Sequence, residues 1–250
     1  MLIQKFGGTS VGSAQRIKDL VKLVVNPTPK IVVLSAMSGT TNALVEISET
    51  LYAKNTKLAI ELIDKLKAKY EKEIAELYAK TETLEKAKDL IRNHFEYIRN
   101  FTLDMFTANE EKAILAQGEL LSTAMFHYYL EETGTASVLL PALNFMRIDA
   151  NDEPDMAYIE TNLLLEIKKH PNDILFITQG YICRNAFGEI DNLKRGGSDY
   201  TASIVGAAIR SEEVQIWTDI DGMHNNDPRV VSKTHPIKEL SFDEAAELAY

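Results

Sequence analysis

The chain has 250 residues, 45% of them hydrophobic and 26% charged, which is enough for one large α/β domain or two small ones. Its net charge of −10 argues against a nucleic-acid or anionic-membrane partner, because such surfaces need a basic excess. A single cysteine, Cys183, excludes an intrachain disulfide, and no apolar run approaches the ~18 residues of a membrane span or forms a signal-peptide core. We therefore expect a cytoplasmic protein without a membrane segment.

The first predicted element is a short apolar strand over residues 2–6, which carries Lys5 and runs directly into Gly7-Gly8. Adjacent glycines let a tight turn bring backbone N–H groups close to an anion, and a neighbouring lysine supplies charge. The stretch matches neither the P-loop G-x-x-x-x-G-K-[ST] nor the dinucleotide fingerprint G-x-G-x-x-G. Taken alone, it leaves phosphate binding and an ordinary tight turn equally open.

Strands and helices are predicted to alternate along the rest of the chain. Apolar runs rich in Val and Ile predict strands at 2–6, 30–35, 137–140, 174–178 and 214–218. Helical patterns separate them at 13–25, 42–53, 155–169, 199–210 and 241–250. This order predicts a three-layer α/β/α sandwich with a largely parallel central sheet, whose ligands bind beyond the carboxyl ends of the strands.

A helical insertion is expected near residues 50–110. One apolar stripe with helical spacing consists of Ile63, Leu66, Tyr70, Ile74 and Leu77. A second consists of Leu84, Ala87, Ile91, Phe95 and Ile98, after a break near 81–83. The stripes predict two antiparallel helices. Because the chain shows no Gly/Ser-rich linker and no repeat, we treat residues 1–250 as one domain.

A second glycine loop, Lys194-Arg195-Gly196-Gly197-Ser198-Asp199, precedes the predicted helix 199–210. Helix N-termini carry partial positive charge and free N–H groups, which suit a carboxylate or a phosphate. Simple capping by Ser198 or Asp199 is the alternative, although it leaves the preceding basic and glycine residues unexplained.

Five motifs together resemble the aspartate kinases of the amino-acid kinase superfamily. They are KFGGTSVG near the N-terminus, LSAMSGTTN at 34–42, QGEL at 117–120, RGGSDYTA at 195–202 and WTDIDGMHNNDPRVV at 217–231. The resemblance implies transfer of the ATP γ-phosphoryl group to the β-carboxylate of L-aspartate, giving 4-phospho-L-aspartate. This reaction is the first step toward lysine, threonine and methionine, and the implied partners are L-aspartate and MgATP.

The resemblance and the chemistry of phosphoryl transfer assign roles to individual residues. Lys5 is the expected cation on the transferring phosphoryl group, with the Gly7 and Gly8 amides beside it. Asp199 is the second expected catalytic residue and orients Lys5, because a β-carboxylate is already ionised and needs no base. Ser35 and Thr41, after the second strand, are expected to contact the γ-phosphate and the substrate. An N-capping turn is their alternative interpretation.

The substrate and the nucleotide need further anchors. Glu119 is expected to bind the substrate α-ammonium, as the equivalent glutamate does in the family, although an exposed residue near a helix N-terminus is its competing interpretation. Arg195 and Ser198 are expected to bind a substrate carboxylate. The predicted nucleotide-binding residues are Lys5, Gly7, Gly8, Thr218, Asp219, His224 and Arg229. No protein metal site is expected, and Mg²⁺ would be held through the ATP phosphates.

Two departures from the family pattern accompany the resemblance. His224 stands where the family often has tyrosine, and Lys194 where it has glycine. The chain also ends at Tyr250, before a lysine-containing Gly-Ala-Lys-Val-Leu-His-Pro-like segment and ACT-type regulatory domains, so we expect a C-terminally incomplete catalytic domain.

The alternative functions are a kinase for glutamate or UMP and an inactive nucleotide-binding fragment. The absence of the dinucleotide fingerprint G-x-G-x-x-G disfavours an oxidoreductase. Assembly as a homo-oligomer stays open.

Overall fold

The computed structural model describes residues 1–103, 105–194, 196–227 and 230–249. The chain divides into two compact units, Met1–Trp217 and Thr218–Tyr250, and each is described by itself. Within the described residues, no helix combines the length and the apolar character needed to cross a membrane.

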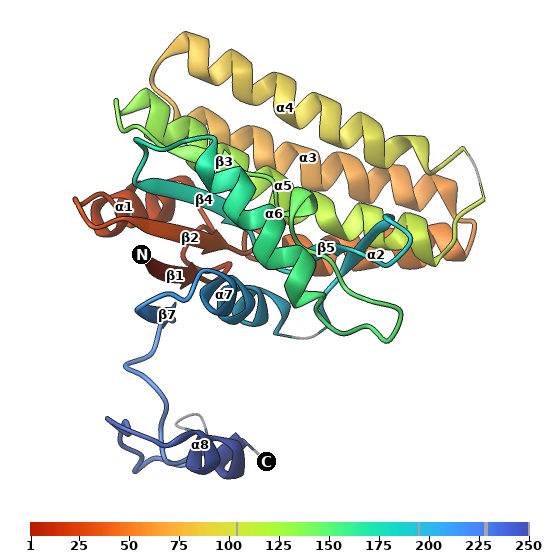
Figure 1. Ribbon diagram of the computed structural model, residues 1–250. Helices are drawn as coiled ribbons and strands as arrows, with labels where there is room; N and C mark the ends of the chain where they lie inside the picture. The colour runs from red at the N-terminus through yellow and green to blue at the C-terminus, as the bar shows by residue number, and fades with distance from the viewer. Residues whose placement is uncertain (104, 195, 228–229, 250) are drawn as a thin grey trace. The chain divides into compact units, whose positions relative to one another are not determined.

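A five-stranded sheet lies at the centre of the first unit (Figure 1). Its strands are β1 (Leu2–Phe6), β2 (Lys30–Leu34), β3 (Val138–Leu140), β4 (Leu175–Gln179) and β7 (Glu213–Trp217). They are ordered β3-β4-β2-β1-β7, and every neighbouring pair is parallel. The five predicted strands are therefore confirmed, with no bound displaced by more than one residue.

The sheet separates two hydrophobic cores, because successive side chains of a strand point to opposite faces of the sheet. Val32 and Leu34 of β2 face one core, while Ile31 and Val33 face the other. Because both faces are covered, the strand reads as a continuous apolar run instead of an alternating one. The helices of the first core include α1 (Ala14–Val24), α2 (Thr40–Tyr52) and α5 (Ala108–Glu132), and those of the second include α6 (Met156–Lys168) and α7 (Gly197–Ala208). This confirms the expected three-layer α/β/α arrangement.

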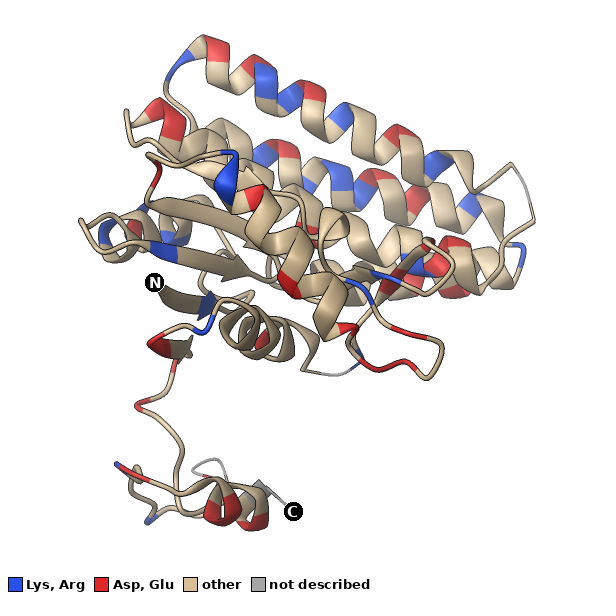
Figure 2. Cartoon of the chain, in the orientation of Figure 1, with Lys and Arg blue, Asp and Glu red and all other residues tan. Residues whose placement is uncertain are grey.

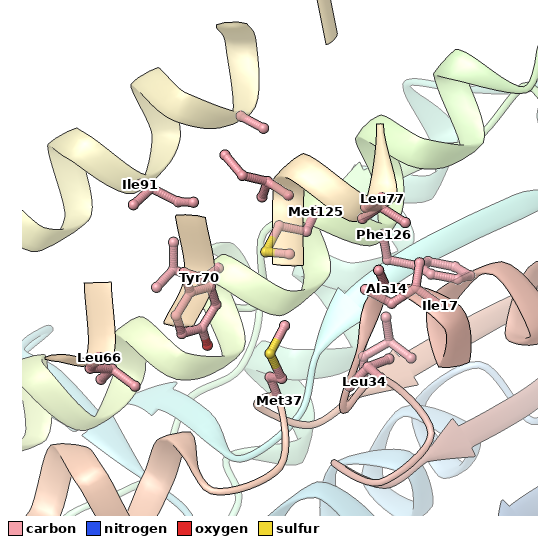
Figure 3. Packing of buried hydrophobic residues seen from close by; sticks show 14 of the residues in the cluster. Ala14, Ile17, Leu34, Met37, Leu66, Tyr70, Leu77, Ile91, Met125 and Phe126 are labelled. Carbon is pink, nitrogen blue, oxygen red and sulfur yellow. The ribbon is translucent and has the colours of Figure 1, made fainter. Parts of the chain in front are cut away.

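The helical insertion consists of α3 (Thr56–Leu77) and α4 (Thr81–Asn100), which pack against each other beyond the sheet-contacting helices (Figure 1). Charged residues are spread along both helices (Figure 2). The apolar stripes of the two helices belong to the first core. Figure 3 shows Leu66 and Tyr70 of α3 and Ile91 of α4 in this core, together with Met125 of α5. The two predicted helices are thus confirmed.

The break between these helices falls at residues 78–80, slightly before the predicted position, and residues 81–83 form the first turn of α4. Tyr78 fixes the break because its ring is buried and its hydroxyl donates a hydrogen bond to the Met125 carbonyl at 2.7 Å. The hydrogen-bond acceptor, Met125, lies on α5, far along the chain, so the sequence around residue 78 gives no sign of this contact.

A further β-hairpin was not expected from the sequence. β5 (Ile182–Arg184) and β6 (Ile190–Asn192) form an antiparallel hairpin, and each is too short to show periodicity. The 25-residue helix α5 is buried around most of its circumference in the segment 113–126, so it has no clear apolar stripe.

Gly206 of α7 offers a test of how tightly the helix packs on the sheet. A Cβ at this position would lie 2.4 Å from Cγ2 of Val214 in β7. Replacing glycine with alanine inside a helix normally stabilises the helix by about 1 kcal/mol. Overpacking a core, however, destabilises the fold by roughly 1–3 kcal/mol. We expect Gly206→Ala to lower the free energy of unfolding in a urea titration. Ser203→Ala, on the exposed face of α7, is the matched control, and equal stability of the two variants would contradict the packing argument.

The second unit contains α8 (Phe242–Ala249) and a loop segment. Ser241 and Glu244 form a reciprocal cap at the start of α8. The Ser241 N–H donates to Glu244 Oε2 at 2.8 Å, and the Glu244 N–H donates to Ser241 Oγ at 3.2 Å. In the loop, the Ile237 N–H donates to the Met223 carbonyl at 2.7 Å. These bonds give the unit its own local order.

Candidate active site

A cleft of about 420 Å³ lies in the first unit, where the carboxyl ends of parallel strands meet the N-terminus of α7. Its lining residues are Lys5, Ser35, Thr41, Glu119, Tyr181, Lys194, Gly196, Gly197, Ser198 and Asp199. The structure therefore brings together residues of four sequence motifs that are far apart along the chain. This is the edge of the sheet at which α/β folds bind ligands.

Lys5 projects into the cleft from β1 and is paired with Asp199. Its Nζ lies 2.6 Å from Asp199 Oδ1, with side-chain exposures of 11% for the lysine and 52% for the aspartate. Asp199 stands in the first turn of α7, whose N-cap residue Gly196 has a left-handed backbone with φ of 77°. The pair fixes the ammonium at the cleft wall, in the geometry needed for the predicted orienting role of Asp199.

The turn after β1 packs directly against the loop after β2. A Cβ at Gly8 would lie 2.6 Å from the Ala36 carbonyl oxygen, closer than side-chain atoms ever approach, so this contact requires glycine. The Ser38 N–H also donates to the Gly8 carbonyl at 3.1 Å. A Cβ at Gly7 would lie 3.7 Å from Lys5 Nζ, so the glycine backbone runs beside the ammonium. Gly7 thus keeps the space beside the Lys5 ammonium free of a side chain, whereas Gly8 is needed for the close packing of the two turns.

Glu119 is a buried acid of the cleft. It lies near the middle of α5 and is only 4% exposed, so the alternative of an exposed residue near a helix N-terminus is wrong. Oε1 accepts a hydrogen bond from the Ala36 N–H at 3.1 Å, whereas Oε2 is buried without a partner among the described residues. Burial raises the pKa of Glu119 to about 8. Such a carboxylate is well suited to receive a cationic ligand group.

Ser198 occupies the N-terminal turn of α7 and is held by the end of β4. A Cβ at Gly180 would lie 2.5 Å from Ser198 Oγ and 2.9 Å from its Cα. Any side chain at Gly180 would therefore displace the start of α7. Ser35 and Thr41 complete the lining, Ser35 directly after β2 and Thr41 in the first turn of α2.

Tyr181 is a cleft residue that sequence reasoning missed. Its backbone is left-handed with φ of 67°, a strained conformation for a bulky residue that is held by two bonds. Its N–H donates to Thr201 Oγ1 at 3.0 Å, and its carbonyl accepts from the Leu193 N–H at 2.7 Å. Burial raises the pKa of the phenol to about 12, so the hydroxyl stays protonated. Its place three residues after the predicted strand 174–178 was the available signal.

Lys194 lines the cleft mouth with a side chain that is 86% exposed, and its Nζ lies 3.6 Å from Asp152 Oδ2. The predicted substrate-binding residue Arg195 and the predicted nucleotide-binding residue Arg229 lie outside the described residues. Within the part of the chain that is described, no group of three or more His, Cys, Asp and Glu residues is arranged to hold a metal ion.

The remaining predicted nucleotide-binding residues, Thr218, Asp219 and His224, belong to the second unit. Asp219 and His224 line a cavity of about 770 Å³ there, whereas Thr218 hydrogen-bonds the Ile220 backbone at 3.2 Å. The His224 ring is fixed at both nitrogens, with Nε2 lying 2.6 Å from Asp221 Oδ1 and Nδ1 lying 3.0 Å from Thr234 Oγ1. Its hydrogen bond lowers the pKa of Asp221.

Comparisons with known proteins agree with this geometry. The chain is 34% identical over 264 residues to the lysine-sensitive aspartokinase 3 of Escherichia coli (strain K12), covering 100% of this chain and 56% of that protein. It is 31% identical over 258 residues to the aspartokinase of Chlamydia trachomatis, covering 99% of this chain and 55% of that protein. The chain spans about half the length of these curated relatives.

The structural comparison gives the same result. The crystal structure of E. coli aspartokinase III in complex with aspartate and ADP (R-state) matches with a TM-score of 0.86 and 32% identity, covering 100% of this chain and 56% of that chain. The model of the amino acid kinase family matches residues 1–250. The family model matches the chain along its whole length, and the chain has a parallel sheet with a glycine turn beside Lys5. The chain therefore belongs to the amino acid kinase family.

Proposed function

We propose that this chain carries the catalytic site of an aspartate kinase, which transfers the γ-phosphoryl group of ATP to the β-carboxylate of L-aspartate. The observation that carries the proposal is the buried Glu119 carboxylate with an unpartnered oxygen, in the same cleft as the cation Lys5. An α-amino acid presents one ammonium and two carboxylates, which suits a cleft with one unpaired anion and a cationic wall. The relatives named as aspartokinases and the complex with aspartate and ADP support this choice.

In the proposed reaction, a β-carboxylate oxygen forms the new bond to the γ-phosphorus while the bond to the ADP oxygen breaks. The carboxylate is already ionised at pH 7, so no protein group has to remove a proton. Lys5 offsets the negative charge that builds up between the two anionic reactants, and Asp199 orients it. Glu119 binds the substrate ammonium, while Ser198 and the N-terminus of α7 bind a substrate carboxylate. Arg195 is proposed to share that carboxylate.

The described residues fit a nucleotide phosphate chain. Gly7 runs beside Lys5 Nζ with no side chain between them, and Gly8 lets this turn pack directly on the loop after β2. We propose Thr218, Asp219, His224 and Arg229 as further nucleotide contacts. Bound Mg²⁺ would neutralise phosphate charge and would be held mainly by ATP oxygens. The same proposal places the reaction at the first step toward lysine, threonine and methionine, in the cytoplasm.

The pH dependence of catalysis tests the role of Glu119. Its carboxyl must be ionised to pair with the substrate ammonium, and its pKa in the free protein is raised to about 8. We expect kcat/KM for aspartate to fall about tenfold per pH unit as the pH drops below this pKa. The measurement is a coupled assay of ADP release between pH 6 and pH 9. A kcat/KM that stays constant over this range would show that Glu119 does not have this role.

The activity itself is tested by trapping an acyl phosphate with hydroxylamine, in the presence of MgATP and either aspartate or glutamate. A hydroxamate formed with aspartate and not with glutamate is the expected result. A signal with glutamate alone would reassign the substrate. Stoichiometric MgATP binding without any hydroxamate would contradict the catalytic proposal and favour a nucleotide-binding fragment.

A further inference from the structure

Helix α3 of the insertion contacts both of the turns that border the proposed phosphate site, although it contributes no residue to the lining of the cleft. Lys69 Nζ donates to the Ser38 carbonyl at 2.5 Å, in the loop after β2. One helical turn further on, Glu73 Oε2 accepts a hydrogen bond from the Ala14 N–H at 2.7 Å, at the first residue of α1. Residues 69 and 73 lie on one face of α3, so the helix holds the two turns from the outside.

Lys69 is placed as a packed structural cation and not as a solvated surface lysine. Its side chain is partly buried, and burial lowers the pKa of its ammonium. A Cβ at Gly39 would lie 3.6 Å from Nζ, so the ammonium sits against the left-handed residue that begins α2. The adjacent Tyr70 is fully buried, and its hydroxyl lies 2.9 Å from Thr40 Oγ1. The contact with Ser38 is therefore made by a rigid part of α3.

Ser38 connects this contact to the glycine turn. While its carbonyl accepts from Lys69, its N–H donates to the Gly8 carbonyl at 3.1 Å. Hydrogen bonds on both sides of one peptide segment polarise and fix it. A Cβ at Gly12 would also lie 3.2 Å from Ser38 Cβ, so the two turns touch at a second point. Lys69, Ser38 and Gly8 thus form a continuous path from α3 to the backbone beside Lys5.

We infer that Lys69 is a positioning residue for phosphoryl transfer, which acts through Ser38 to hold the Gly7–Gly8 turn in its anion-binding geometry. The inference rests on the proposed function, since it assigns the turn to the nucleotide phosphates. It concerns the insertion, a part of the chain to which the proposed reaction gives no other role. Loss of the ammonium would loosen the turn and weaken nucleotide binding more than aspartate binding, because Glu119 lies on α5 and Ser198 on α7.

The test compares Lys69→Met, which keeps the aliphatic stem, with Lys69→Arg, which keeps a cationic donor. We expect Lys69→Met to raise KM for MgATP by about tenfold, as for the loss of one charge-assisted hydrogen bond. KM for aspartate should change by less than about twofold, and Lys69→Arg should recover most of the MgATP affinity. A general loss of stability would not separate the two KM values in this way.

Lys72→Met is the matched control, because Lys72 lies on the same helix with a side chain that is 75% exposed. Hydrogen exchange followed by mass spectrometry gives a readout that needs no activity. Peptides covering residues 6–13 and 35–40 should exchange faster in Lys69→Met and remain as in the wild type in Lys72→Met. Unchanged exchange in both peptides, an equal change in the control, or an unchanged KM for MgATP in an active enzyme would overturn the inference. If the wild type makes no acyl phosphate, the proposed function fails, and the exchange data still decide whether Lys69 holds the turn.

Discussion

Replacing Lys5 with methionine is expected to lower kcat by about 1,000-fold, the range measured when one preorganised donor to a reacting oxyanion is removed. Lys5 is the described cation closest to the glycine turn, and its Nζ is fixed by Asp199 at 2.6 Å. Methionine keeps much of the side-chain volume but offers no charge to offset the repulsion between the two anionic reactants. KM for aspartate should change by less than about threefold, because Lys5 acts mainly on the transferring group.

The measurement is steady-state kinetics of the ADP-release assay with both substrates varied. Lys22→Met is the control, since that lysine lies on α1 with a side chain that is 72% exposed. A kcat of Lys5→Met within about twofold of the wild type, under ~0.5 kcal/mol of barrier, would remove Lys5 from the mechanism. Asp199→Asn should give a smaller loss of kcat, because it leaves the ammonium in the cleft and only loosens its orientation.

Glu119→Gln is expected to raise KM for aspartate by about 100-fold, which corresponds to the loss of a buried charged pair worth roughly 2–3 kcal/mol. Glutamine can still accept the Ala36 N–H hydrogen bond, so the shape of the cleft is kept. The neutral amide cannot balance the substrate ammonium. The dependence of kcat/KM on pH expected for the wild type should also disappear in this variant, which separates loss of charge from distortion.

The same substitution should stabilise the ligand-free protein. The folded-state pKa of Glu119, about 8, lies above the ordinary value of 4.5. The folded protein therefore binds more protons than the unfolded chain between these values, and its stability falls as the pH rises through this window. Glutamine does not titrate, so the variant does not lose stability as the pH rises through this window. We expect Glu119→Gln to raise Tm by several degrees above pH 8, with the gain shrinking toward pH 4.

Thermal unfolding at several pH values provides the measurement, with Glu61→Gln on the exposed side of α3 as the control. A Tm of Glu119→Gln equal to or lower than that of the wild type at pH 9 would contradict the description of Glu119 as a strained buried anion. The opposite effects on stability and substrate binding would identify Glu119 as a residue kept for function at the expense of stability.

The sheet was predictable from the sequence because its central strands are continuous apolar runs. β2 and β4 are buried along their whole length, so their sequences alone indicate strands covered on both faces. The stripes on α3 and α4 were equally clear, because each helix buries one face only. The three-residue strands β5 and β6 gave no periodic signal, and their pairing depends on a turn that only the structure defines.

The candidate site was predictable in its residue types but not in its physical state. The glycine turns and the resemblance indicated Lys5, Glu119, Ser198 and Asp199, which the structure brings into one cleft. Their catalytic and binding roles stay predictions. The burial of Glu119 depends on how α5 packs against the loop after β2, and the strained backbone of Tyr181 depends on bonds to Thr201 and Leu193. Such long-range contacts leave no trace in a local pattern.

The position of β1 between β2 and β7 has a consequence for how the protein is made. Gln4 of β1 is joined to Gln215 of β7 across a sequence separation of 211 residues, and the Asp199 partner of Lys5 is also translated late. At roughly 5–20 residues per second, the first strand waits at least about ten seconds on the ribosome for this neighbour. The helices of the insertion need only nearby sequence and are free to form earlier. The catalytic cleft is therefore expected to be among the last parts of the nascent chain to fold.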